Sequence, residues 1–150
     1  MEWIDNLRGT TVAVDTAPLI YFVEDNPFWS PIVKPFFEAL DSGLFQALTS
    51  TVTLAEVLVH PFRRSQPALA REYRRILLSA RNLATIPVTA AIAERAAELR
   101  GRYSLRMPDA IQLATAIDAH AGTFLTNDKS LSIPVSLRII TLEGLRPMTT

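Results

Sequence analysis

Residues 108–131, PDAIQLATAIDAHAGTFLTNDKSL, join a helix signal to a strand signal and decide the fold class. Pro108 suits the first turn of a helix, and Gly122 suits its end. The following residues, 123–126, form a short apolar run that is typical of a buried strand. The run stops at Asn127-Asp128-Lys129, so we expect the strand to carry a carboxylate to its tip.

The same alternation of helix and strand signals continues along the whole chain. Strands are predicted at residues 11–15, 44–50, 83–88, 123–126 and 137–142. Helices are predicted at residues 17–24, 32–42, 53–60, 67–81, 89–103 and 108–122. Pro35 is a candidate break, a helix end is expected before Pro61, and residues 61–67 are the expected loose connection. The pattern predicts one α/β domain over residues 1–150, with a mainly parallel central sheet flanked by helices.

The composition is that of an ordinary globular domain. The chain has 150 residues, of which 49% are hydrophobic and 20% are charged, and it has no cysteine. Disulfides and thiolate metal sites are therefore excluded, and the absence of cysteine fits a reducing compartment. No run approaches the ~20 apolar residues of a transmembrane helix, and the N-terminus does not resemble a signal peptide. We expect a cytoplasmic protein without a membrane anchor.

Charge is unevenly distributed, although the net charge is zero. Residues 1–62 hold eight acidic and two basic residues, whereas residues 63–106 hold ten arginines and three glutamates. Such an arginine-rich band fits solvated helix faces with Glu–Arg pairs. It also fits a rim for nucleic acid or for an acidic partner. Composition leaves both interpretations open.

Four acidic residues fall where strands end or helices begin. Asp15 and Asp128 follow predicted strands, and Glu56 and Asp109 lie in the first turns of predicted helices. Ligands of open parallel sheets bind outside the carboxyl ends of the strands, so the four can converge there. Each also has a purely local explanation: a helix cap for Asp15, a capping box from Thr53 to Glu56, a first-turn acid for Asp109 and a turn for Asp128.

Convergence of four carboxylates would imply a bound cation. Two carboxylates about 4 Å apart repel by roughly 4 kcal/mol at an effective dielectric of about 20. The two histidines, His60 and His120, lie in unrelated predicted helices without metal-ligand spacing, so the ligands would be hard oxygens. Such ligands favour Mg²⁺ or Mn²⁺ over Zn²⁺. Ions of this kind commonly assist in-line displacement at phosphate.

Four stretches, VDTAPLIYFVE, TLAEVL, PDAIQLATA and TFLTNDKSL, occur in an order that resembles the PIN-domain ribonucleases. More narrowly, the chain is similar to the VapC-type toxins of toxin–antitoxin pairs, from about residue 12 to residue 142. The resemblance implies a PIN-like three-layer sandwich and metal-dependent cleavage of RNA. It also implies a homodimer, and an antitoxin whose tail fills a groove near the acids.

The resemblance assigns roles to six residues. Four of them would coordinate Mg²⁺ or Mn²⁺, the last often through a water: Asp15, Glu56, Asp109 and Asp128. Two hydroxyl groups would orient the site: Thr16 and Thr126. The chain departs from the family at Lys129-Ser130, where many relatives carry a further acid, and at Leu131, where many have an aromatic residue.

Two other functions fit the same residues. If the acids only cap helices, the chain is a non-catalytic module that binds RNA or a peptide. If the metal site forms, the same chemistry also suits a deoxyribonuclease. Metal binding separates the first alternative from the ribonuclease, and competing RNA and DNA substrates separate the second.

Overall fold

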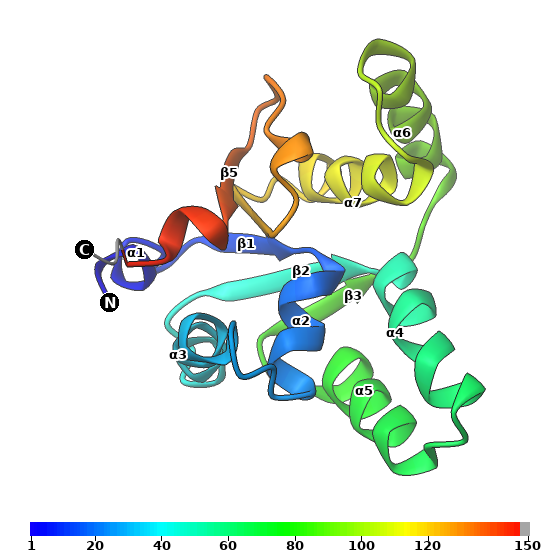
Figure 1. The fold of residues 1–150 in the computed structure, drawn as a ribbon. Coiled ribbons are helices and arrows are strands. Elements are labelled where there is room, and N and C mark those ends of the chain that lie inside the picture. Colours follow the sequence, from blue (N-terminus) through cyan, green and yellow to red (C-terminus); the bar gives the residue numbers. More distant parts are fainter. Residues whose placement is uncertain (148–150) are drawn as a thin grey trace.

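The computed structural model describes residues 1–147 and shows a five-stranded sheet between layers of helices (Figure 1). The strands are β1 (Thr11–Val14), β2 (Gln46–Ser50), β3 (Leu83–Ile86), β4 (Thr123–Thr126) and β5 (Arg138–Thr141). Their order is β3-β2-β1-β4-β5, and every neighbouring pair is parallel. The predicted α/β sandwich is confirmed, and its sheet is wholly parallel.

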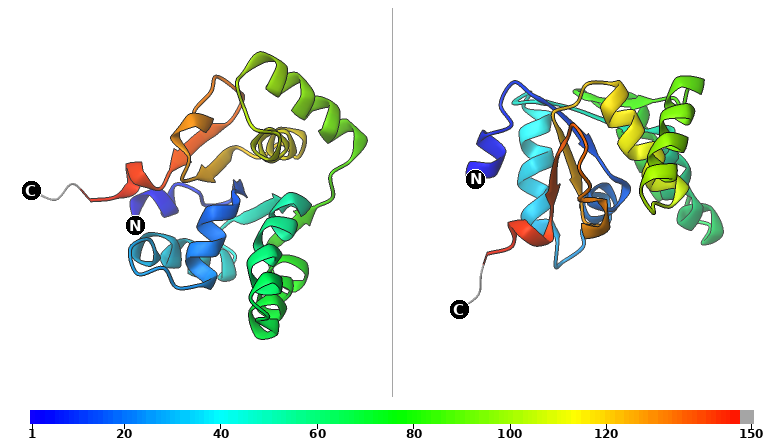
Figure 2. Two further views of the ribbon diagram at one scale, coloured as in Figure 1. Left: turned by 45° about the vertical axis from the view of Figure 1, so that its right-hand side comes forward. Right: turned by 90° about the horizontal axis from the view of Figure 1, so that it is seen from above.

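The helices lie on both faces of the sheet (Figure 2). They are α1 (Glu2–Asp5), α2 (Thr16–Val23), α3 (Ser30–Asp41), α4 (Thr51–Arg63), α5 (Pro67–Ser79), α6 (Ala90–Arg102) and α7 (Met107–Asp118). Two short 3₁₀ helices follow, η1 (Lys129–Leu131) and η2 (Glu143–Leu145). In the views of Figures 1 and 2, α6 and α7 cover one face, and α2, α3 and α5 cover the other. Within residues 1–147, no helix has the length and hydropathy that crossing a membrane requires.

Each face of the sheet has its own hydrophobic core. Val12 and Val14 pack into the core under α2, α3 and α5, whereas Ala13 packs into the core under α6 and α7. In β4, Leu125 belongs to the first core and Phe124 to the second. This alternation follows from the two-residue period of a strand, which points successive side chains to opposite faces. Both faces are apolar because both are covered, as is usual for parallel sheets.

Proline ends fewer helices than the sequence suggested. The helix expected to end before Pro61 continues to Arg63, and the candidate break at Pro35 does not occur in α3. A proline removes one helical hydrogen bond and crowds the preceding turn. Pro61 lies in the last turn of α4 and is buried, so packing offsets that loss. The expected loose connection at 61–67 is therefore only residues 64–66.

The topology brings several chain segments to one edge of the sheet. The carboxyl ends of β1, β2 and β4 lie at the same edge, because these strands are parallel neighbours. Helices α2 and α4 begin there directly after β1 and β2. Side chains that follow these strands are consequently neighbours in space, although up to 111 residues separate them in the sequence.

Candidate active site

Four carboxylates line one cavity at this edge of the sheet. The cavity measures about 290 Å³, and its lining residues come from α2, α4, the start of α7 and the turn after β4: Asp15, Thr16, Ala17, Ile20, Tyr21, Glu56, Arg106, Asp109, Asn127 and Asp128. All four predicted acids and Thr16 are among them. Thr126 is fully buried and forms hydrogen bonds with Asp15 and Asp128.

Asp15 is held by two hydrogen bonds at the end of β1. Its Oδ1 accepts from the Thr16 N–H at 2.8 Å, and its Oδ2 accepts from the Thr126 hydroxyl at 2.7 Å. Burial raises the pKa of the Asp15 carboxyl above its ordinary value. The two hydrogen bonds oppose this rise, whereas the negative charges of Asp109 and Glu56 add to it. A buried carboxylate beside two further acids stores unfavourable electrostatic energy that a cation would relieve.

Asp128 combines a structural role with a place in the cavity. Its Oδ1 accepts from the Ser130 N–H at 2.9 Å and from the Ser130 hydroxyl at 2.6 Å, so it caps η1. Its own N–H donates to Thr126 Oγ1 at 3.0 Å. Because Thr126 in turn donates to Asp15, one hydroxyl ties the end of β4 to the end of β1.

Glu56 does not form the capping box that its spacing from Thr53 suggested. The N-cap of α4 is Ser50, whose Oγ accepts from the Val52 N–H at 3.1 Å, so Thr53 lies inside the helix and is buried. Glu56 Oε1 instead accepts from the Thr16 hydroxyl at 2.9 Å. The Glu56 carboxylate therefore faces α2 and the cavity rather than the helix backbone.

Arg106 is a cavity residue that the sequence analysis did not single out. Its Nε donates to Asp109 Oδ2 at 3.2 Å. The hydrogen bond and charge of Asp109 raise the pKa of the Arg106 guanidinium, with smaller contributions from Glu56 and Asp128. The Arg106 side chain is 76% exposed, so it is free to exchange the Asp109 carboxylate for another anionic group. Its position as the last arginine of the basic band was the available signal.

Tyr21 and Asn127 form part of the cavity wall and were also missed. Asn127 Nδ2 donates to the Tyr21 hydroxyl at 3.2 Å, and the Tyr21 ring stacks on Trp29 with centroids 5.7 Å apart. Aromatic side chains on which bases stack are typical of sites for single-stranded nucleic acid. Asn127 stands in the polar run after β4, but no pattern in the sequence pairs it with Tyr21.

The oxygen ligands of the cavity suit a hard divalent cation, although their carboxylates are not grouped around a single position. Within residues 1–147, no three carboxylate or histidine groups lie close enough together to hold a single ion directly. Each acid is instead engaged by its own neighbour, as the hydrogen bonds above show. The donors are nevertheless all oxygens, and Mg²⁺ usually keeps several waters between itself and its protein ligands. The negative charge of the buried Asp15 carboxylate also favours binding of a divalent cation.

Several solved structures have a similar fold. The chain matches VapC20 of Mycobacterium tuberculosis, described as a sarcin-ricin loop cleaving toxin, with a TM-score of 0.69 and 22% identity over 85% of this chain and 98% of that one. It matches a toxin–antitoxin complex from Klebsiella pneumoniae with a TM-score of 0.66 and 27% identity over 87% and 97%. It matches VapBC2 of Rickettsia felis, bound to promoter DNA, with a TM-score of 0.68 and 21% identity over 87% and 98%. No curated protein sequence matches the chain.

A protein-family model identifies the chain more directly than these structures do. The model described as PIN domain matches residues 12–133, which is most of the chain. The matched span runs from β1 through η1, so it includes all the predicted acids and both hydroxyl residues. The resemblance to PIN domains is thereby confirmed, and the chain belongs to the PIN domain family, a family of nucleases.

Proposed function

We propose that the chain is a Mg²⁺- or Mn²⁺-dependent endoribonuclease and the toxin of a toxin–antitoxin pair. The observation that carries the proposal is the meeting of four acids from distant parts of the chain in one cavity: Asp15, Glu56, Asp109 and Asp128. The description of VapC20 as a sarcin-ricin loop cleaving toxin supports RNA as the substrate class.

Some residues of the cavity would bind the metal ion, and others would bind the RNA. The four acids would hold the ion, with Asp128 acting through a water. A bound divalent ion would supply Lewis acidity for hydrolysis of a phosphodiester bond. Thr126 and Thr16 fix the orientations of Asp15 and Glu56 by donating to their carboxylates. Arg106 would move from Asp109 to a phosphate oxygen of the RNA, because a guanidinium binds phosphate through two parallel hydrogen bonds.

Titration of Mn²⁺ into the purified chain tests the metal site. We expect saturable binding that weakens at least about 100-fold in Asp109→Asn, since a direct ligand should matter more than the roughly 10- to 100-fold effect of supporting residues. Asp118→Asn is the matched control, because Asp118 is an exposed acid on the same helix and lies outside the cavity. Absence of binding in the unaltered chain would favour four helix caps and hence a binding module.

Competition between RNA and DNA oligonucleotides of one sequence tests the substrate class. We expect cleavage of the single-stranded RNA in the presence of Mn²⁺ and no cleavage of the DNA. The 2′-hydroxyl is the group that allows a protein to distinguish the two. Cleavage of the DNA at an equal or higher rate would replace the ribonuclease by the deoxyribonuclease.

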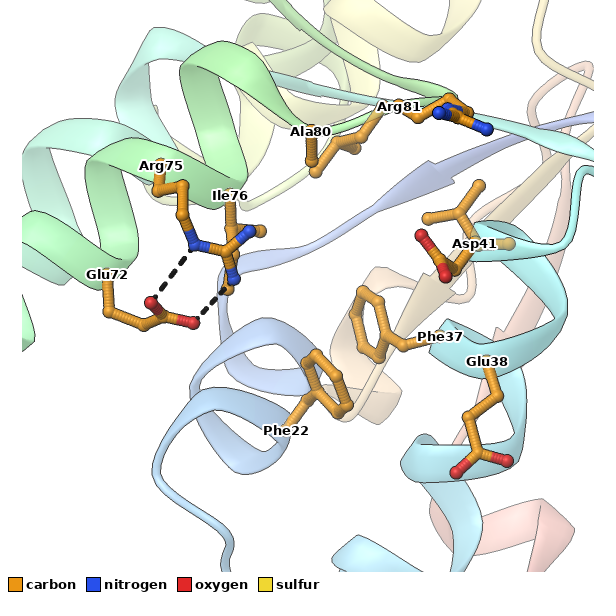
Figure 3. Close-up of a pocket in the computed structure, with 11 residues that line it drawn as sticks. Phe22, Phe37, Glu38, Asp41, Glu72, Arg75, Ile76, Ala80 and Arg81 are labelled. Carbon is orange, nitrogen blue, oxygen red and sulfur yellow. Dashed lines mark hydrogen bonds and ion pairs between the residues drawn. The ribbon is translucent and has the colours of Figure 1, made fainter.

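An antitoxin is the proposed partner. The resemblance places its tail near the acids, and a second cavity, which shares no lining residue with theirs, also suits it. This cavity measures about 400 Å³ and lies between α2, α3 and α5 (Figure 3). Phe22 and Phe37 stack in it with centroids 4.4 Å apart, and Glu38 and Asp41 of α3 stand at its rim. The lining also carries the Glu72–Arg75 ion pair and Arg81, so an apolar segment with charges of both signs at its ends matches it. Several of the similar structures are toxin–antitoxin complexes, which supports such a partner.

A homodimer is the proposed assembly of the toxin itself. Val59 and Phe62 lie one helical turn apart on α4 and are 49% and 61% exposed. Exposed apolar side chains grouped on one helix face favour contact with a second surface. Light scattering of the chain alone distinguishes the mass of one copy, 16.6 kDa, from that of two.

A further inference from the structure

Gln112 is a buried amide in the middle of α7, one helical turn after Asp109. It is 3% exposed, and most of its neighbours along the buried face of α7 are alanine or leucine. Burying an amide without partners costs on the order of 1–3 kcal/mol. The hydrogen bonds of Gln112 therefore decide what this residue does.

The amide of Gln112 binds three hydroxyl groups on other elements. Its Nε2 donates to Thr53 Oγ1 at 2.6 Å and to Thr16 Oγ1 at 3.2 Å. Its Oε1 accepts from the Ser50 hydroxyl at 2.9 Å. Gln112 thus connects α7 to the start of α2 and to the first turn of α4, and all four side chains are buried.

These bonds have a fixed direction, which leads to Glu56. A hydroxyl has one hydrogen, and Thr16 donates it to Glu56 Oε1 at 2.9 Å. Thr16 is therefore free to accept from the Gln112 amide. If the amide were turned by 180°, its carbonyl oxygen would face Thr16, and Thr16 would have to donate to Gln112 instead of Glu56. The orientation of Gln112 consequently determines whether the Thr16–Glu56 bond can form.

The same residues lie directly behind three of the acids. Gln112 follows Asp109 by three residues on α7, and Glu56 follows Thr53 by three residues on α4, so each pair shares a helix face. Thr16 directly follows the third acid, Asp15, in the sequence. The buried hydrogen bonds therefore join the three elements that carry these carboxylates.

We infer that Gln112 is a positioning residue for the metal site, whose buried amide sets the spacing between the Glu56 and Asp109 carboxylates. This role rests on the proposed function, because it concerns the same acids. Gln112 does not line the cavity, so it acts through Thr16 and Thr53 and not by touching the ion. Residues that orient metal ligands in this way typically change metal affinity about 10- to 100-fold when they are altered.

The test is Mn²⁺ titration of Gln112→Met, in which the side chain keeps its length and loses its hydrogen bonds. We expect the dissociation constant for Mn²⁺ to rise about 10- to 100-fold. Thr115→Val is the matched control, because Thr115 is also buried in α7 but its hydroxyl binds only the Ile111 carbonyl, at 2.7 Å. The control should keep the Mn²⁺ affinity of the unaltered chain, and thermal unfolding of both variants is recorded alongside.

Each result of this titration has a distinct meaning. Unchanged Mn²⁺ affinity in Gln112→Met, or an equal loss in Thr115→Val, would overturn the positioning role and leave the proposed function standing. Absence of Mn²⁺ binding in the unaltered chain would overturn the proposed function, and the positioning role with it. If Gln112→Met does not fold, Thr53→Val replaces it, because that change removes the 2.6 Å hydrogen bond and preserves side-chain volume. A smaller rise in the dissociation constant is expected there, because the bonds of Gln112 to Thr16 and Ser50 remain.

Discussion

Asp15→Asn is expected to abolish RNA cleavage and, in a metal-free buffer at neutral pH, to raise the midpoint of thermal unfolding. Cleavage should fall on the order of 10³- to 10⁴-fold, because the acids of a catalytic centre act as a unit. The carboxylate is replaced by an amide of nearly the same shape. Its oxygen can still accept from the Thr16 N–H, whereas its nitrogen cannot accept from the Thr126 hydroxyl. An unfolding midpoint no lower than that of the unaltered chain would show that the loss of activity comes from charge and not from misfolding.

The gain in stability follows from the pKa of Asp15. Burial raises this pKa in the folded chain above the unfolded value of 3.8. Above pH 3.8 the unfolded chain binds fewer protons than the folded one, so stability falls as the pH rises through the folded pKa. Above the folded pKa the whole loss is present, and an uncharged amide removes it at the cost of one hydrogen bond. Each kcal/mol gained should raise the unfolding midpoint by about 2–4 °C.

Addition of Mn²⁺ should reverse the order of the two proteins. A ligand that binds only the folded state stabilises it by mass action, so the unaltered chain should gain stability and Asp15→Asn should not. Asp118→Asn, which changes an exposed acid outside the cavity, should behave as the unaltered chain in every measurement. A lower unfolding midpoint for Asp15→Asn in chelator would show that the carboxylate stabilises the fold and is not under electrostatic strain.

The sequence was sufficient for the architecture because the relevant signals are local. The run TVAV before Asp15 and the run TFLT before Asp128 are short, apolar and followed by polar residues, and both became strands of the parallel sheet. The predicted end of α4 before Pro61 was wrong. That prediction rests on the destabilising effect of proline inside an isolated helix. In the folded chain Pro61 is buried, and packing decides where the helix ends.

The site was only partly accessible to the same reasoning. The acids could be placed because the ends of parallel strands meet at one edge whatever the side-chain details. Their partners on other elements could not, because the Thr16–Glu56 hydrogen bond and the burial of Gln112 depend on which helix faces meet. The pair of Arg106 and Asp109 is local, three residues apart at the start of α7. The apparent capping box at Thr53 failed for a related reason: Ser50 caps α4 earlier, and its own bond to Gln112 fixes it there.

Phe36→Ala is expected to have the largest effect on stability and little effect on chemistry. Phe36 is fully buried in α3, stacked on Trp3 at 5.8 Å and packed against Phe37 at 5.1 Å and Phe45 at 4.8 Å between ring centroids. Removing a buried aromatic ring leaves a cavity and costs about 3–5 kcal/mol. That is a large share of the roughly 5–15 kcal/mol that stabilises a typical domain. Urea denaturation of the variant measures the loss.

Phe28→Ala serves as the control, because Phe28 is 52% exposed and its removal should cost about 1 kcal/mol or less. Cleavage by Phe36→Ala should equal that of the unaltered chain when both are assayed well below the variant's unfolding midpoint. The reason is that Phe36 lies in the core under α3, whereas the acids are held by hydrogen bonds among α2, α4, α7 and β4. The two regions are in contact, because Phe36 shares its hydrophobic core with Leu19 of α2 and Val57 of α4. A fall in cleavage without unfolding would show that this shared core transmits the change in packing to Thr16 and hence to Glu56.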